Sequence, residues 1–245
     1  HGWRLRGDGV RARVPLNEPT PKAVGSIATT SVPVLELAGA LWIYTGKLQD
    51  APDPLSPEVP KSLQGPPRQF GTYCQHWNAH WTRAVENFVD FAHPSYLHRD
   101  TIGSWTHDYA ESGAVATVEV QPEPWGFTTL NYFTSRRQGF RVDWYRPNLS
   151  VIHFGGSAES KLHVFSIPES ATRTRVMTVR RLPPGVDAAA YSARAATVDN
   201  TILDEDRMVV ESQQGPVDDD REISVATDAP AVAFRRWHQE MLKVR

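Results

Sequence analysis

Residues 113–181 carry a succession of about six strand-like segments, and this succession restricts the possible folds strongly. Each segment is short, rich in β-branched and aromatic residues, and bounded by turn residues, which is typical of strands. They include Phe127 to Phe133, Phe140 to Tyr145, Leu149 to Phe154 and Leu162 to Ile167. Consecutive strands with short turns favour an antiparallel sheet, because parallel strands need a long crossover connection. The sequence therefore predicts a curved antiparallel sheet.

Helical patterns stand on both sides of these strands. Apolar residues recur at intervals of three and four over 74–92, which predicts a single helix with one buried side. Pro94 then ends that helix, because the residue before a proline is pushed out of the α region. Two more helices are predicted over 187–201 and 204–213, and a last helix is capped by Asp228. The predicted fold class is α+β, with helices laid against the sheet.

The N-terminal part of the chain has a different character. Residues 1–46 contain short strand-like segments separated by turn signals, and prolines recur between residues 52 and 67. Because proline denies both helical and ladder hydrogen bonds, this stretch predicts an irregular linker. The predicted organisation is a small β domain over 1–50, a proline-rich linker over 51–70 and a larger domain over 71–245.

Charge and hydropathy argue against two classes of partner. The 26 basic and 28 acidic residues give a formal net charge of −2. The sequence therefore lacks the excess of basic residues that is typical of nucleic-acid-binding proteins. No apolar run approaches the roughly 18 to 20 residues that a membrane span needs. The only cysteine, Cys74, excludes an internal disulfide framework and is typical of a reducing compartment, so we expect a cytoplasmic protein.

The segment from Glu86 to His98 places two imidazoles and a carboxylate close together. His93 and His98 are five residues apart, which on a continuous helix would turn them roughly 140° away from one another. A break at Pro94 removes this objection, because the chain can loop back after it. Two imidazoles, one carboxylate and open coordination positions form the ligand set of non-heme Fe(II) oxygenases. The alternative is that both histidines are hydrogen-bonded core residues.

A third ligand must come from another segment, and the acidic run Asp204, Glu205 and Asp206 is the candidate. The alternative is that these acids only complement the dipole at a helix N-terminus. Asp90 precedes His93 by three residues, so we expect both on the same face of the predicted helix. Its neighbours are apolar, and a carboxylate there is costly without a hydrogen bond. It could accept from the second nitrogen of a metal-bound histidine, or from N–H groups of a buried polar network.

These residues resemble the catalytic helix of the oxygenase component of Rieske non-heme iron oxygenases. The family motif is Asp-x-x-His followed by a second histidine four or five residues later, which here is Asp90-Phe91-Ala92-His93 and His98. The flanking Glu86-Asn87 and the segment from Arg99 to Gly103 resemble the O-demethylase branch, which includes vanillate and dicamba demethylases. The run from Asp206 to Glu211 resembles the family's late Asp-x-x-Val-Val-Glu context, so the resemblance selects Asp206 over Asp204 as third ligand.

The N-terminus adds a second resemblance to the same family. His1-Gly2-Trp3, followed by Gly7-Asp8-Gly9, resembles the end of the second Rieske motif, and Leu41 to Gly46 resembles the closing Rieske strand. By this resemblance His1 is one ligand of a [2Fe–2S] cluster, and residues 1–50 are the C-terminal part of a Rieske β-domain. Such a cluster needs two Cys and two His. The sequence cannot complete it, so we expect the rest of the motif upstream of residue 1.

The resemblance implies a helix-grip (START-like) catalytic domain over 71–245, with a mononuclear Fe(II) held by His93, His98 and Asp206. In the family, a reductase or ferredoxin supplies electrons to the Rieske cluster of one subunit. They reach the iron of the neighbouring subunit through the carboxylate at the position of Asp90. The implied activity is O₂-dependent hydroxylation or O-demethylation of an aromatic or other apolar small molecule by a homotrimer or hexamer. Asn87 is either a donor near the iron or a polar residue on the outer side of its helix.

Two other functions remain open. A non-catalytic helix-grip module would bind an apolar ligand without metal, and would leave His93, His98 and Asp206 apart. A zinc hydrolase could use the same three ligands, but it leaves His1-Gly2-Trp3 unexplained. The sequence does not fix the substrate. An apolar cavity beside the iron is expected, with these candidate wall residues: Phe127, Leu130, Phe140 and Ile152.

Overall fold

The chain divides into two compact units, which comprise residues 1–57 and 58–245. The computed structural model describes residues 2–16, 28–44, 46, 50, 59–134, 136–154, 160–213, 215–217 and 222–243. In the smaller unit, two antiparallel pairs are formed by β1 (Arg4–Leu5) with β2 (Arg11–Arg13) and by β3 (Val34–Leu37) with β4 (Ala40–Ile43). The short strands predicted for this part of the chain are therefore confirmed. The three predicted domain ranges stay predictions, and residues 51–58 of the expected linker lie outside the described residues.

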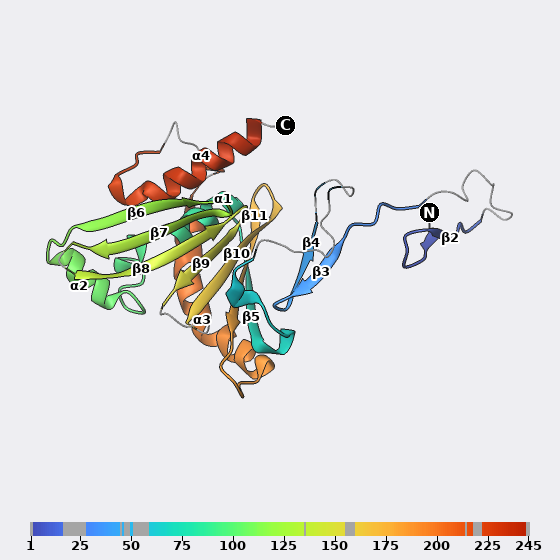
Figure 1. Ribbon diagram of the computed structural model, residues 1–245, viewed down its shortest axis with the longest axis horizontal. Helices are drawn as coiled ribbons and strands as arrows, with labels where there is room; N and C mark the ends of the chain where they lie inside the picture. Colours follow the sequence, from blue (N-terminus) through green and yellow to red (C-terminus); the bar gives the residue numbers. More distant parts are fainter. Residues whose placement is uncertain are drawn as a thin grey trace. The chain divides into compact units, whose positions relative to one another are not determined.

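The described part of the larger unit contains a seven-stranded antiparallel sheet (Figure 1). Its order is β5-β11-β10-β9-β8-β7-β6, so the last six strands in the chain are neighbours in sequence order and β5 closes one edge. The strands are β5 (Phe70–Trp77), β6 (Ala116–Glu123), β7 (Gly126–Phe133), β8 (Arg136–Tyr145), β9 (Leu149–His153), β10 (Lys161–Ser170) and β11 (Arg173–Arg181). The predicted curved antiparallel sheet and the α+β class are confirmed.

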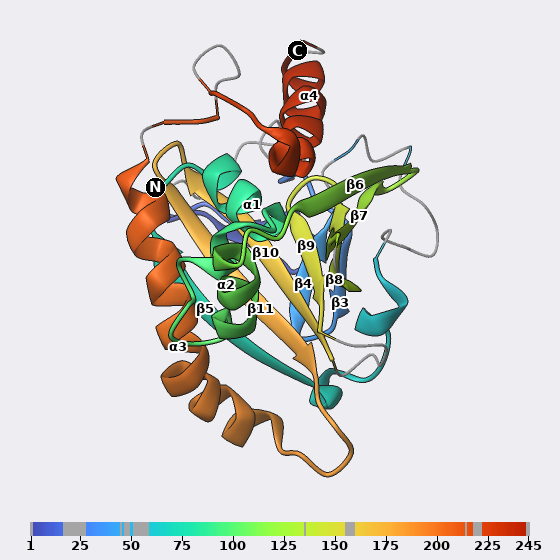
Figure 2. The same cartoon turned by 90° about the vertical axis from the view of Figure 1, so that its left-hand side faces the viewer.

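Helices cover one face of this sheet (Figures 1 and 2). They are α1 (Trp81–Val89), α2 (Ser104–Glu111), α3 (Ala188–Ser212) and α4 (Ala229–Lys243). Helix α3 runs along β5, α4 lies beside β6, and α1 sits between them over β9 and β10. Across the residues described, no helix is both long and apolar enough to cross a membrane.

Two apolar clusters hold the helices against the sheet, and α1 contributes to both. Phe88 of α1 packs with Trp77 at the end of β5 in the first cluster. Val85 packs with Trp144 of β8 and Phe234 of α4 in the second. Full burial of each such side chain stabilises the fold by about 1.5–3 kcal/mol. Helix α1 is therefore fixed from two sides, and the residues that follow it start from a well-defined position.

The prediction of a single helix over 74–92 is wrong at both ends. Residues 74–77 belong to β5, and α1 ends at Val89 rather than at His93. The spacing misled because Trp77, Trp81 and Val85 are four residues apart and all face the core, although Trp77 does so from a strand. The prediction of two late helices is also wrong, because α3 is continuous from Ala188 to Ser212.

Candidate metal centre

The three predicted metal ligands converge in the larger unit. His93, His98 and Asp206 each offer one ligand atom, and these atoms lie within 4.8 Å of one another. Asp206 Oδ1 lies 3.1 Å from His98 Nε2 and 3.5 Å from His93 Nε2. His98 and Asp206 are buried, and His93 is partly exposed. The fold thus brings together residues separated by 108 positions (206 − 98).

Asp90 positions the first histidine from outside the helix. It is the C-cap of α1, with extended backbone, so the expected placement of Asp90 and His93 on one helical face is wrong. Its carboxylate accepts from the backbone N–H groups of Ala92 and His93, at 3.0 and 2.9 Å, and lies 3.2 Å from His93 Nδ1. Burial would raise the pKa of Asp90, but these hydrogen bonds and the His93 ring hold it below its usual value. The carboxylate therefore stays ionised and orients the ring.

The second histidine returns through a compact turn. Pro94 does not end a helix as predicted but stands inside a short 3₁₀ turn, His93–Ser95. Farther on, Gly103 donates its N–H to the carbonyl of His98 at 2.8 Å. A Cβ at position 103 would lie 1.8 Å from the Pro94 carbonyl oxygen, so only glycine fits there. The expected looping back of the chain after Pro94 is thus confirmed, with a different local structure.

Glu205 holds the second histidine and was not predicted to do so. Its Oε2 atom lies 2.7 Å from His98 Nδ1 and accepts from Thr101 Oγ1 at 3.1 Å. The signal that could have identified it is the acidic run itself. Three consecutive carboxylates in mid-helix have no dipole to complement, because α3 begins sixteen residues before Asp204 (204 − 188). Each needs a partner of its own.

Asp206 has an unsatisfied oxygen at the centre of this group. Oδ1 is buried and has no hydrogen-bond partner among the described residues, although both Nε2 atoms are near. The contacts are close, but they do not follow hydrogen-bond directions. Burial would lower the pKa of His98, while its contacts with Asp206 and Glu205 outweigh burial and raise it. A buried carboxylate oxygen without a partner is costly, and a cation shared with both Nε2 atoms would satisfy it.

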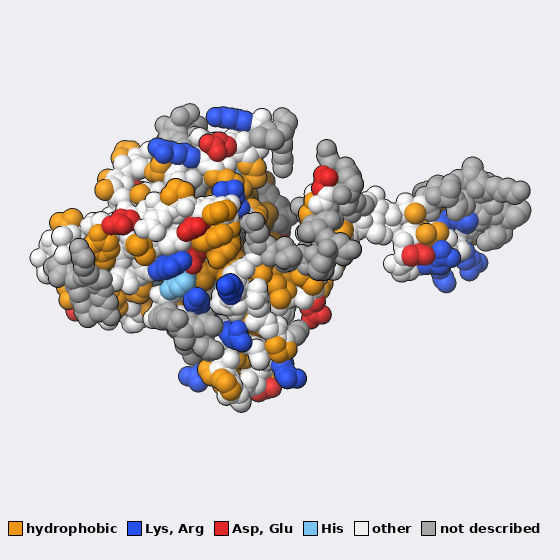
Figure 3. Space-filling model, viewed as in Figure 1, with side chains coloured by type: hydrophobic (Ala, Val, Ile, Leu, Met, Phe, Trp, Pro, Cys, Tyr) orange, Lys and Arg blue, Asp and Glu red, His pale blue; other side chains and the backbone are white. Residues whose placement is uncertain are grey.

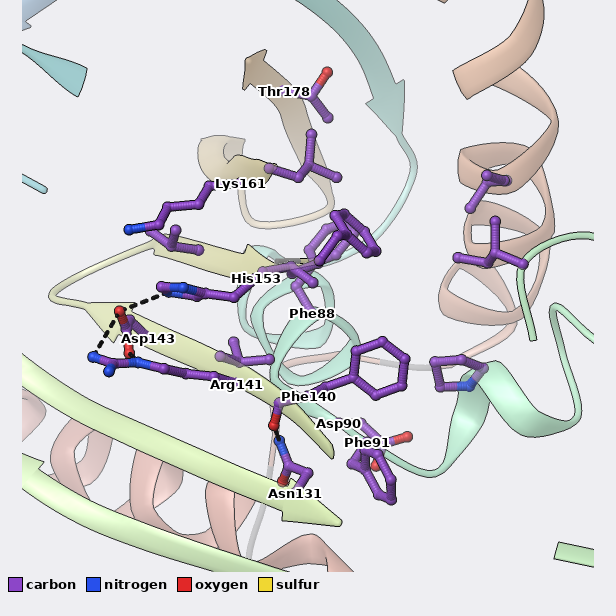
Figure 4. A pocket seen from close by; sticks show the side chains of 18 of the residues that line it. Phe88, Asp90, Phe91, Asn131, Phe140, Arg141, Asp143, His153, Lys161 and Thr178 are labelled. Atoms are coloured by element: carbon purple, nitrogen blue, oxygen red, sulfur yellow. Dashed lines mark hydrogen bonds and ion pairs between the residues drawn. The ribbon is translucent and has the colours of Figure 1, made fainter. Parts of the chain in front are cut away.

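A cavity of about 1300 Å³ adjoins the three residues. Figure 4 shows Phe88, Phe91 and Phe140 around it, with Asp90 beside Phe91. Phe88 belongs to α1, Phe91 follows the end of that helix, and Phe140 belongs to β8. The sheet adds a row of apolar residues that are in register across neighbouring strands. That row is Val142, Ile152 and Leu162. The cavity can therefore hold an apolar molecule next to the candidate ligands.

Two of the four predicted wall residues line this cavity, and two do not. Phe140 and Ile152 are among its lining residues. Phe127 is instead buried in the core with Trp144 and Phe234, where α4 covers it. Leu130 is the neighbour of Asn131, which lines the cavity, so its side chain points to the opposite face of the sheet. Sequence alternation could not show which face carried the cavity, because both faces of these strands contain buried residues.

The structure does not test the predicted roles of Asn87 and His1. Asn87 lies on α1 and is not among the residues that line the cavity, but its Nδ2 atom is buried without a hydrogen-bond partner in the described part of the chain. A role for this amide stays a prediction. His1 lies outside the described residues, so its assignment to a [2Fe–2S] cluster stays a prediction as well.

Known proteins resemble this chain in sequence. The family described as "Vanillate O-demethylase oxygenase C-terminal domain" matches residues 77–244. A 3-chlorobenzoate-3,4-dioxygenase oxygenase subunit of Comamonas testosteroni is 28% identical over 40% of this chain and 22% of its own length. A carbazole 1,9a-dioxygenase terminal oxygenase component of Metapseudomonas resinovorans is 32% identical over 42% of this chain and 26% of its own. A probable 3-ketosteroid-9-alpha-monooxygenase oxygenase component of Rhodococcus rhodochrous is 25% identical over 98% of this chain and 63% of its own.

Solved structures show the same fold. Dicamba monooxygenase bound to dicamba superposes with a TM-score of 0.69 at 18% identity, over 100% of this chain and 78% of that one. A Pseudomonas putida NdmA mutant with theobromine gives a TM-score of 0.70 at 21% identity, over 98% of this chain and 69% of that one. The chain spans less than two thirds of the length of the curated relatives named above.

Proposed function

This chain belongs to the family of vanillate O-demethylase oxygenase C-terminal domains, and from that premise we propose that its larger unit is the catalytic domain of an Fe(II)-dependent oxygenase. The family match and the named relatives confirm the predicted resemblance to oxygenase components of Rieske oxygenases. The proposed reaction is the O₂-dependent hydroxylation or O-demethylation of an aromatic or other apolar small molecule. The observation that carries the proposal is the convergence of His93, His98 and Asp206.

The donor set supports iron at this position. Two imidazoles and one carboxylate with remaining open positions are the ligands of non-heme Fe(II) oxygenases. The unsatisfied Asp206 Oδ1 beside two Nε2 atoms is the arrangement that a shared cation would stabilise. In this proposal His93 and His98 bind through Nε2 and Asp206 through its carboxylate. Bound there, Fe(II) would supply the redox chemistry that activates O₂.

The residues around the ligands have separate tasks. Asp90 accepts from His93 Nδ1, and Glu205 accepts from His98 Nδ1, so each Nε2 keeps a lone pair for the metal. The apolar cavity wall excludes water and holds the substrate beside the ligands. Asp90 is partly exposed, with 27% of its side chain accessible, so it can both orient His93 and meet a group outside this unit.

The proposed reaction needs a source of electrons, and that source lies outside the larger unit. We infer from the family that Asp90 links the ligand His93 to a [2Fe–2S] cluster of a neighbouring subunit, which a reductase or ferredoxin reduces. The two hydrogen bonds that His93 and Ala92 donate to Asp90 support a fixed position for that link. Assembly as a homotrimer or hexamer, a cytoplasmic location, and His1 as a cluster ligand remain parts of the same proposal.

The convergence of the three candidate ligands argues against one alternative function and leaves the other open. A non-catalytic helix-grip module would leave the three candidate ligands apart, and their convergence argues against it. A zinc hydrolase would use the same three ligands, because catalytic zinc also accepts two histidines and a carboxylate. Metal analysis of the purified full-length protein separates zinc from iron.

The proposed function is tested by Asp206→Ala in the full-length protein, followed by iron analysis and substrate-dependent O₂ consumption. We expect loss of mononuclear iron and of activity, because two imidazoles alone bind Fe(II) weakly. The matched control is Asp204→Ala, which removes a carboxylate from the same helix. Asp204 instead pairs with Asn200 and Gln75 and does not contact the histidines. Retention of stoichiometric mononuclear iron by Asp206→Ala would refute the assignment.

A further inference from the structure

The start of α2 is hydrogen-bonded to both segments that carry the candidate histidine ligands. Gly103 donates its backbone N–H to the carbonyl of His98 at 2.8 Å, and α2 begins directly after Gly103. The second connection is made by a side chain of the same helix. His107 Nδ1 lies 2.9 Å from the carbonyl oxygen of Ser95, the last residue of the 3₁₀ turn His93–Ser95. Helix α2 therefore fixes the two ligand segments relative to each other.

The carbonyl of Ser95 depends on this side chain for a hydrogen bond. A turn of three residues leaves its last carbonyl groups without donors of its own. In the described part of the chain, no backbone N–H donates to the Ser95 carbonyl, and Ser95 is only 4% exposed. Because a carbonyl can only accept, Nδ1 of His107 carries the proton and donates it. His107 is therefore the donor that satisfies the end of the turn that begins at His93.

The residues next to His107 belong to the wall of the cavity. Trp105 and Thr106 line the cavity from α2. The Trp105 ring lies 5.3 Å from the ring of Phe140, centre to centre, and Thr106 is buried with its hydroxyl donating to the Gly103 carbonyl at 2.8 Å. Two consecutive residues of α2 thus face the cavity, and the third holds the turn with the first candidate ligand.

The charged surface of the sheet lies on the face that α2 does not cover. Figure 3 shows Lys and Arg side chains beside a histidine on the surface over β9 and β10. In the register of β8, β9 and β10, a charged row alternates with the apolar row that lines the cavity, so the two rows lie on opposite faces. The charged row is Arg141, His153 and Lys161. Because Trp105 packs on Phe140 of the apolar face, these charges take no part in the packing of α2.

We propose that His107 is a positioning residue of the candidate metal centre, which holds the turn that carries His93 through the carbonyl of Ser95 and joins that turn to the cavity wall. This role rests on the proposed function, because it assumes that His93 binds a metal. Without the donor, the metal-free protein can shift the turn until the Ser95 carbonyl reaches water, and this shift displaces His93. Metal binding must then restore the turn and bury the carbonyl without a partner, which is unfavourable.

The test compares two uncharged replacements of His107 in the full-length protein. His107→Asn keeps a donor, because the amide nitrogen of asparagine takes about the position of Nδ1, but it loses the ring. His107→Phe keeps a ring against Tyr96, whose ring lies 5.8 Å away, but it loses the donor. In anaerobic titrations with Fe(II), repeated with Zn(II), we expect His107→Phe to bind the metal at least about fivefold more weakly than the wild type. His107→Asn should stay within about twofold of the wild type.

Charge and general effects of α2 are controlled separately. The pKa of Asp100 is lowered by Arg99 and, to a smaller extent, by His107, and both replacements remove the histidine alike, so a charge effect cannot distinguish them. The control Glu111→Ala changes an exposed residue at the end of α2 and should leave the dissociation constants within about twofold. Thermal unfolding of the metal-free proteins shows whether each variant is folded. His107→Leu, which also lacks a donor, replaces His107→Phe if that variant does not fold.

A dissociation constant of His107→Phe within about twofold of the wild type would overturn the proposal. Equal losses in His107→Phe and His107→Asn would also overturn it, because they would assign the effect to the packing of the ring. Asp206→Ala in the same titrations identifies failure of the proposed function. If Asp206→Ala loses the metal and His107→Phe does not, the positioning role fails and the metal site stands. If Asp206→Ala binds the metal like the wild type, the metal site itself fails, and the role of His107 fails with it.

Discussion

Replacing Glu205 by alanine tests how the protein prepares His98 for a metal. In the native protein the Nδ1–H of His98 donates a hydrogen bond to Glu205 Oε2 at 2.7 Å, and this tautomer leaves a lone pair on Nε2. Without Glu205, the proton can move to Nε2, where the negative charge of Asp206, whose Oδ1 lies 3.1 Å away, attracts it. Metal binding must then break this new interaction and expose an Nδ1–H that has no acceptor. Glu205→Ala should therefore weaken metal binding and leave the three ligands in place.

The magnitude follows from the burial of the histidine. His98 is 2% exposed, so water cannot replace the lost acceptor. An unsatisfied buried donor costs about 1–3 kcal/mol, which corresponds to roughly 5- to 150-fold in metal affinity. This range includes the roughly 10- to 100-fold loss typical when a partner that orients a ligating histidine is removed. Glu205→Gln should fall between wild type and alanine, because its amide oxygen can still accept from Nδ1.

The assay is anaerobic titration of metal-free protein with Fe(II), repeated with Zn(II), to obtain dissociation constants. The control variant is Glu211→Ala, which removes another carboxylate of α3. The Glu211 carboxylate accepts from the backbone N–H of Asn78 and does not contact His93, His98 or Asp206. The same dissociation constant, within about twofold, for Glu205→Ala and wild type would refute the reasoning. Equal losses in both alanine variants would show a general effect of α3 rather than control of the tautomer.

Two further predictions follow from the same neighbourhood and from the sheet. Asp90→Asn should retain iron but lose substrate-coupled turnover, measured as product formed per O₂ consumed; full coupled activity would count against a linking role. Burial disfavours the charged ring of His163 and lowers its pKa from the ordinary value of 6.5 to about 4. Since the unfolded chain binds the proton first, the free energy of unfolding should fall as pH drops from 6.5 toward 4, by up to about 3 kcal/mol. His163→Gln should flatten that part of the curve in urea titrations, and an unchanged slope would contradict the assignment.

The strands could be predicted from the sequence because alternation and turn residues act locally. β5 could not, since Trp77 at its end continues the spacing of α1 by coincidence. Its pairing with β11 also joins residues about a hundred positions apart. Helix α2 was not predicted because it has little apolar periodicity, and Thr106 is its buried residue.

The three candidate ligands could be named from the sequence, whereas the residues that hold them in position could not. The resemblance identified His93, His98 and Asp206 as a set, and the structure places them together. The acidic run indicates that its carboxylates need partners, but the partner of Glu205 depends on where the loop that carries His98 lies, and no local pattern encodes that. The acidic run was interpreted as a possible helix start, whereas the partners of Glu205 and Asp206 lie in a different segment of the chain.

The continuity of α3 has a consequence for how this family of chains can vary. Asp204 binds Gln75 on β5, Glu205 binds His98, and Asp206 faces both histidines, so three adjacent residues point in three required directions. Successive residues on a helix differ by about 100° in direction. A single residue inserted into α3 between its N-terminus and Asp204 would rotate all three carboxylates at once, or else detach the first half of the helix from β5. Length changes should therefore be tolerated after Ser212 and not within the helix, while substitution of Met208, which is 68% exposed, should be nearly neutral.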